Sequence, residues 1–200
     1  TNGYSGIYAF YVYDLKGDYY YGVGHREVMQ AASLIKLPVM YLAMKNGEDK
    51  APIEAMGKRS DNGAFTKMVG ILGKENVNKT ISDLGMSNTS LSKNLTTPEE
   101  IGLFFKKLYK KELLNEEKTE ELESFMIDTN FENWLRLGIP EDIKLIHKYG
   151  REARVVNDAG IVMSDRPFVM VVMADGVIEK EADELIPKLA KLLYDNHTRE

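Results

Sequence analysis

The sequence of 200 residues contains no cysteine, which excludes disulfide bonds, thiolate catalysis and cysteine-based metal sites. It also lacks a membrane-spanning stretch, because its longest apolar run, Leu34–Met44, is shorter than the roughly 20 residues that cross a bilayer. There is no stripe of lysine and arginine, and the net charge is −5, so nothing indicates a nucleic acid or an anionic membrane as partner. The remaining composition, 44% hydrophobic and 28% charged, is typical of a globular domain with a large core.

Strand patterns occupy the start and the last third of the chain, and helical patterns occupy the middle. Residues 7–24 alternate and turn at Lys16-Gly17-Asp18, which predicts a hairpin. Thr97-Pro98-Glu99-Glu100 predicts a helix start, because it combines a capping hydroxyl, an early proline and two acids. Further strands are predicted at 143–150, 152–163 and 166–176, and helices at 33–45, 63–72, 75–84, 98–113, 116–127 and 179–194.

These elements predict an α/β (α+β) fold with an antiparallel five-stranded sheet formed by both chain ends. Terminal helices flank that sheet, and the remaining helices form an inserted, all-helical lobe. We expect a single domain over residues 1–200, with a sheet lobe at about 1–30 and 143–200 and a helical lobe at about 33–140. A cleft between two such lobes is the usual place for a small-molecule site.

One lysine, Lys36, interrupts the apolar run Leu34–Met44. Ser33 lies three residues earlier, so the two side chains share one face of a helix. A buried lysine has a lowered pKa and can take a proton from a serine, which then becomes a nucleophile. The alternative is that Ser33 caps the helix and Lys36 reaches solvent.

The spacing S-x-x-K is weak evidence by itself, because it occurs again at Ser90-Leu91-Ser92-Lys93. That second copy lies in a polar segment with no apolar helix to desolvate its lysine. We therefore expect it to have no catalytic role.

Two further motifs follow in order: Ser60-Asp61-Asn62 before a predicted helix, and Lys148-Tyr149-Gly150 on a predicted strand. Separately, each has a simpler explanation as a helix cap, a solvent-facing lysine or a strand irregularity. Together, S-x-x-K, S-D-N and K-x-G resemble the signature of class A β-lactamases and penicillin-binding proteins. The resemblance covers nearly the whole chain, including "AASLIKLPVM", "SDNGAFTKMVGILG" and "NDAGIV", and implies a β-lactamase/transpeptidase-like fold.

The resemblance implies a role for each motif residue. Ser33 is the acyl-accepting nucleophile, Lys36 is its general base, and Ser60 passes a proton toward the leaving nitrogen. Asn62 holds the side-chain amide of the ligand, while Lys148 attracts its carboxylate and helps to lower the pKa of Lys36. The backbone N–H groups of Ser33 and Arg151 form the oxyanion hole, and Gly150 lets the ligand lie against the strand.

Two departures from the family pattern stand out. Tyr149 replaces the usual Thr or Ser of K-x-G, so its oxygen is expected to lie further out and to shift carboxylate recognition. The connection from Met86 to Thr96 is short and has no acidic residue, whereas class A enzymes carry their deacylating glutamate in a longer loop. We assign Glu99 and Glu100 to the start of the next helix.

The resemblance predicts a serine hydrolase that forms an acyl-enzyme with β-lactams or D-alanyl peptides and deacylates slowly. A cell-wall D-alanyl peptidase or transferase and a non-enzymatic β-lactam sensor are the alternatives. The resemblance implies that no metal or cofactor is needed, and His25, His147 and His197 show no metal-ligand spacing. We expect a monomer at a secreted, periplasmic or cell-surface location, with a leader removed before Thr1.

Overall fold

Both ends of the chain contribute strands to one antiparallel sheet. The computed structural model describes residues 3–199. The strand order is β2-β1-β7-β6-β5, so the first hairpin lies beside the last strand of the chain. The strands are β1 (Ile7–Asp14), β2 (Tyr19–Val23), β5 (Leu145–Glu152), β6 (Val155–Val162) and β7 (Phe168–Asp175). The predicted fold class and five-stranded sheet are therefore confirmed.

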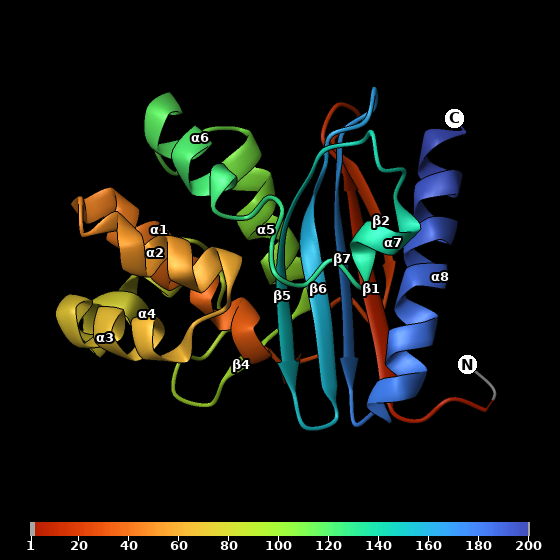
Figure 1. The fold of residues 1–200 in the computed structure, drawn as a ribbon, viewed down its shortest axis with the longest axis horizontal. Helices are drawn as coiled ribbons and strands as arrows, with labels where there is room; N and C mark the ends of the chain where they lie inside the picture. Colours follow the sequence, from red (N-terminus) through yellow and green to blue (C-terminus); the bar gives the residue numbers. More distant parts are fainter. Residues whose placement is uncertain (1–2, 200) are drawn as a thin grey trace.

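The sheet is covered on both faces, as Figure 1 shows. One face packs on the middle helices, and the other packs on the long C-terminal helix α8 (Glu179–Thr198). In β7, Val169, Val171 and Met173 belong to the first core, while the alternate residues belong to the second. Burial on both faces explains why β6 and β7 are almost continuous apolar runs.

The middle of the chain is helical. Its helices are α1 (Lys36–Asn46), α2 (Lys50–Lys58), α3 (Asn62–Leu72), α4 (Lys74–Asp83), α5 (Pro98–Tyr109) and α6 (Glu116–Ser124). The start predicted for α5 is confirmed, because Thr97 Oγ1 accepts from the N–H of Glu100 at 3.1 Å. Helix α2, capped by Asp49, was not predicted. No helix within residues 3–199 combines the length and the apolar character needed to cross a bilayer.

Four short elements complete the described part of the fold. A 3₁₀ turn, η1 (Ala32–Ile35), precedes α1, and a two-residue ladder joins β3 (Met29–Gln30) to β4 (Leu95–Thr96). The short helix α7 (Leu135–Gly138) packs against α8, and Trp134 and Leu135 lie in the core on that side of the sheet. The proposed division into two lobes stays a prediction, but this segment near the end of the helical stretch contributes to the sheet-side core.

Candidate active site

Ser33 lies in the 3₁₀ turn η1, one turn before α1 begins at Lys36. Its hydroxyl caps neither element, so the alternative of a simple capping serine is wrong. The preceding residue, Ala32, has φ +46°, a left-handed conformation that costs an alanine energy. The chain is thus held in an unfavourable conformation at the point where it presents Ser33.

Lys36 is buried, with 2% of its surface exposed, so it does not reach solvent as the alternative required. Its Nζ lies 3.1 Å from Ser33 Oγ, 3.1 Å from Ser60 Oγ and 2.7 Å from Asn62 Oδ1. It also donates to the carbonyl oxygen of Ser60 at 2.5 Å. Burial lowers the pKa of Lys36 to about 8, against the opposing attraction of Asp61 and Glu152.

The S-D-N turn brings two of these partners to Lys36. Ser60 has φ +55°, so the backbone reverses sharply immediately before α3. Asp61 then caps α3, because its Oδ1 accepts from the N–H of Ala64 at 2.7 Å. In the next turn of α3, the Phe65 ring centroid lies 5.8 Å from Lys36 Nζ. The structure therefore joins the first two motifs into one hydrogen-bonded cluster.

The third motif approaches the nucleophile through Gly150. A Cβ at this position would lie 2.8 Å from the backbone nitrogen of Ser33 and 3.1 Å from the Cβ of Ala32. Glycine is therefore required for β5 to pack against the turn that carries the nucleophile. The sequence-based explanation was different, since it attributed Gly150 to contact with the ligand.

Lys148 lies beside this cluster without bonding to it. Its Nζ donates to the carbonyl oxygen of Tyr149 at 2.8 Å and lies 4.0 Å from the centroid of that residue's ring. Complete burial and the nearby charge of Lys36 hold the pKa of Lys148 well below its usual range. Burial is the main cause of the lowered pKa at both lysines, and the charge of Lys36 adds to it at Lys148.

Tyr149 faces away from the nucleophile. Neighbouring residues of a strand point to opposite faces, and the Tyr149 ring lies in the core next to α8, 4.5 Å from the ring of Phe131. Burial raises its pKa to about 12, and its hydroxyl has no hydrogen-bond partner among residues 3–199. The expectation that its phenol oxygen would shift carboxylate recognition is therefore wrong.

The oxyanion hole predicted from the sequence uses the backbone N–H groups of Ser33 and Arg151. Ser33 lies in the first turn of η1, where leading N–H groups have no partner within the helix. β5 is an edge strand, and the N–H of His147 points outward to the carbonyl oxygen of Met126 at 2.8 Å. The N–H of Arg151, four residues later, points to the same open edge. Its side chain is exposed and forms an ion pair with Asp183.

The sequence-based prediction did not include Asn157, a residue of the sheet that holds the backbone just before the nucleophile. Asn157 is completely buried on β6, opposite Gly150. Its Nδ2 donates to the carbonyl oxygens of Gln30 and Ala31, at 2.8 and 3.1 Å, directly before the nucleophile's turn. The segment "NDAGIV" contributed to the family resemblance, but no role was predicted for Asn157. A polar residue within an apolar strand was the signal that could have indicated one.

The two glutamates at the start of α5 both bind partners outside the candidate active site. Glu100 is buried, and its Oε1 accepts from the N–H of Asn88 at 2.7 Å while its Oε2 accepts from Thr89 Oγ1 at 2.6 Å. Glu99 forms an ion pair with Arg26 at 3.0 Å. Both lie in the first turn of the helix, as predicted. Glu100 therefore organises the short connection that replaces a longer loop.

The described part of the chain holds no group of three His, Asp or Glu side chains arranged for a metal ion. His147, completely buried, lies between Asp158 at 2.7 Å and Glu132 at 3.1 Å. These two carboxylates, against the effect of burial, raise the pKa of His147 to about 9. This charged network ties β5 to the segment around Glu132.

A family model described as the beta-lactamase enzyme family matches residues 1–51 and 50–197. Among solved structures, a mutant of PBP-A described as an acyl-enzyme complex with penicillin G is similar, with a TM-score of 0.91 and 21% identity. The alignment covers 100% of this chain and 93% of that one. No curated protein matches the sequence at a significant level.

Two β-lactamase structures are also similar. That from Sphaerobacter thermophilus has a TM-score of 0.90 and 18% identity, covering 98% of this chain and 93% of that one. That from Xanthomonas campestris pv. campestris has a TM-score of 0.88 and 17% identity, covering 97% and 93%. These similarities confirm the β-lactamase/transpeptidase-like fold predicted from the sequence.

Proposed function

Since this chain belongs to the beta-lactamase enzyme family, we propose that Ser33 attacks the carbonyl carbon of a β-lactam or of a D-alanyl peptide to form an acyl-enzyme. One observation supports this most directly: the buried Nζ of Lys36 lies 3.1 Å from Ser33 Oγ, within hydrogen-bond reach of the proton to be removed. A general base works best with a pKa near the ambient pH, and Lys36 is close to that range.

The proposed acylation step uses this geometry. Neutral Lys36 takes the proton of Ser33 Oγ as that oxygen forms its bond to the carbonyl carbon. The N–H groups of Ser33 and Arg151 stabilise the negative charge on the carbonyl oxygen. Ser60 Oγ, also 3.1 Å from Lys36 Nζ, passes its proton to the leaving nitrogen as the carbon–nitrogen bond breaks, and it receives the proton that Lys36 took from Ser33.

The ligand's polar groups are assigned to the residues around this centre. Asn62 Oδ1 accepts from Lys36, which leaves its amide N–H groups to donate to the carbonyl oxygen of the ligand's side-chain amide. Binding of the ligand carboxylate by Lys148 requires that Lys148 be charged, and burial opposes this. We assign Lys148 to this role with the expectation that the carboxylate itself restores the charge.

Deacylation is proposed to be slow. Hydrolysis of the ester requires a base to activate water, and the residues from 86 to 96 contain no carboxylate. Glu99 and Glu100 are held by other partners. Among carboxylates whose charge acts on Lys36, Asp61 caps α3 and Glu152 accepts from Asn94. Each therefore has a structural partner of its own.

The test is a time course with nitrocefin and intact-protein mass spectrometry. We expect a burst near one equivalent, followed by slow turnover, and a penicillin adduct that persists for minutes. Fast linear turnover without a burst would contradict slow deacylation. Absence of any penicillin adduct would contradict the acyl-serine function.

The PBP-A mutant trapped with penicillin G leaves a second function open, a D-alanyl peptidase or transferase. In that function, a D-alanyl peptide donates its acyl group to Ser33, and a peptide amine or water then accepts it. Release of D-alanine from such a peptide would favour it over a β-lactam sensor. Action of either kind is proposed to occur outside the cytoplasm.

A further inference from the structure

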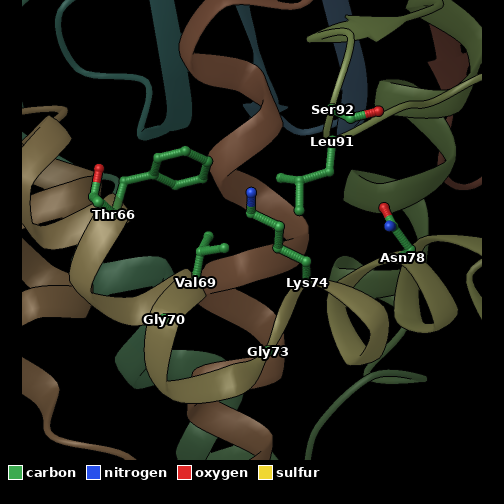
Figure 2. Close-up of a pocket in the computed structure, with 9 residues that line it drawn as sticks. Thr66, Val69, Gly70, Gly73, Lys74, Asn78, Leu91 and Ser92 are labelled. Carbon is green, nitrogen blue, oxygen red and sulfur yellow. The ribbon is translucent and has the colours of Figure 1, made fainter.

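A pocket of about 660 Å³ lies between α3, the start of α4 and the short connection before α5, as Figure 2 shows. Its lining includes Phe65 and Val69 from α3, Leu91 from the connection, and Lys74 from α4. None of the roles assigned above uses this space.

The pocket adjoins the candidate active site along both of its walls. On one side, Phe65 lines the pocket and its ring centroid lies 5.8 Å from Lys36 Nζ. On the other, the connection continues from Leu91 to Asn94, whose carbonyl oxygen accepts from the N–H of Ala31 at 2.8 Å. Each wall is therefore connected to the residues next to Ser33.

The α3 wall also continues from the residue expected to hold the ligand. Asn62, Thr66 and Val69 are spaced i, i+4 and i+7, so they share one face of the helix. At 1.5 Å per residue, Asn62 and Val69 are about 10 Å apart along the helix axis. A side chain that extends from an amide bonded to Asn62 along this face would enter the pocket.

The chemistry of the lining is apolar with one cation. Phe65, Val69 and Leu91 supply apolar surface, and no carboxylate lines the pocket. Lys74 forms no ion pair with any residue from 3 to 199, and Figure 2 shows its side chain extending into the space between Val69 and Leu91. An apolar chain that ends in an anion complements this arrangement.

We propose that this pocket binds the acyl side chain of the donor, and that the preferred donor has a flexible apolar side chain ending in a carboxylate that pairs with Lys74. This inference rests on the proposed acylation of Ser33. It adds a substrate class, an acidic acyl donor, to that function.

The experiment measures the rate of Ser33 acylation by penicillins with succinyl, adipyl and suberyl side chains. Each is compared with the same penicillin carrying a terminal primary amide in place of the side-chain carboxylate. We expect the acid to react about 5-fold faster than the amide for the adipyl or suberyl chain, as for a partly exposed ion pair. The succinyl chain is too short to reach Lys74 and should show no preference.

Lys74→Ala should abolish the preference, and Lys74→Glu should reverse it. Lys79→Ala is the matched control, because Lys79 lies on the same helix, is exposed, and pairs with Asp83 outside the pocket. Equal rates for acid and amide in the wild type, or a preference that survives Lys74→Ala, would overturn the proposal.

A second variant tests the pocket without changing charge. Gly70 lines it, and a Cβ there would meet no atom within 4 Å. Gly70→Leu should fill the space and slow acylation by adipyl and suberyl penicillins about 10-fold, with succinyl penicillin unaffected. An unchanged suberyl rate would also count against the pocket.

Labelling by benzylpenicillin tests acylation of Ser33 separately from binding of an acidic side chain in the pocket. If it labels Ser33 but the acids show no preference, the pocket proposal alone is wrong. If no penicillin labels Ser33, the proposed function is wrong and the pocket proposal is overturned with it.

Discussion

Ser33 and Lys36 lie where a 3₁₀ turn meets a buried helix, whereas the half-buried Ser90 and the exposed Lys93 lie in the connection before α5. In the first pair, Lys36 Nζ donates to the serine hydroxyl and to the S-D-N turn. In the second, the serine hydroxyl accepts from the backbone N–H of Lys93 at 3.3 Å and shares a hydrogen bond with Ser92 Oγ at 3.4 Å. Identical spacing thus gives a candidate base in one place and a surface turn in the other.

The difference shows that the S-x-x-K spacing alone does not make a lysine a candidate base. Lys36 is removed from water, and this loss of solvation lowers its pKa toward neutrality. Lys93 is exposed and lacks the second serine and the asparagine that surround Lys36. Burial and the neighbouring motif therefore distinguish the two copies, and each can be tested by paired substitutions.

The largest effect is expected at the two serines. Ser33→Ala should abolish the penicillin adduct, because it removes the proposed nucleophile, while Ser90→Ala should be labelled as the wild type is. Intact-protein mass spectrometry followed by peptide mapping measures both. Labelling of Ser33→Ala would remove the distinction between the two copies.

The two lysines should differ nearly as much. Lys36→Ala should slow acylation by about 10²–10⁴-fold, the usual range for a general base. Lys93→Ala should leave the rate unchanged. Single-turnover acylation rates provide the measurement, and a Lys36→Ala protein with the wild-type rate would show that another group takes the proton.

The pH dependence should follow Lys36. Its pKa of about 8 means that the neutral, basic form increases about tenfold per pH unit below that value and then levels off. The acylation rate from pH 6 to 9.5 should follow the same curve. A rate that stays flat or falls with rising pH would exclude neutral Lys36 as the base.

The stability of the fold should also depend on pH, because His147 titrates within the same pH range. Its pKa is raised in the folded state to about 9, so its ion pairs contribute stability that is fully present below about pH 6.5. That contribution is lost as the pH rises through 9. The unfolding temperature should therefore fall at the alkaline end, and His147→Gln should reduce this dependence.

The smallest effects are expected at the glutamates beside the second copy. Glu100→Gln should destabilise the protein by about 1–3 kcal/mol, because a buried carboxylate anchors residues 88 and 89. Glu99→Gln should change stability by less than about 0.5 kcal/mol, since its ion pair is exposed. Thermal unfolding measures both.

Neither glutamine substitution should alter steady-state nitrocefin turnover. A loss of turnover in either variant would assign a catalytic carboxylate to the start of α5. The slow deacylation proposed here would then be wrong.

Several features of the fold were predictable because they depend on local pattern. The apolar run around Lys36 predicted a buried helix, and α1 has nine buried residues. The hydroxyl, proline and acids at 97–100 predicted the start of α5. Burial of Lys36 was also foreseeable, since nearly every neighbour along its helix is apolar.

Other features depended on packing that the sequence does not display. Gly150 is required by the backbone of Ser33, which is more than one hundred residues away along the chain. Tyr149 was assigned to the ligand by resemblance, yet strand alternation buries its ring on the other face of the sheet. Asn157 likewise shows its purpose only once β6 lies behind residues 30 and 31.

The sequence by itself determined the order of the elements, the apolar surroundings of Lys36 and the absence of a carboxylate between 86 and 96. These follow from residue types and short-range periodicity, which the chain carries locally. Only the tertiary structure decided which serine–lysine pair meets Ser60 and Asn62, because those contacts join residues 24 and 26 positions apart. Contacts of that separation depend on how α1, α3 and β5 pack together, and only that packing removes water from one lysine and leaves the other exposed.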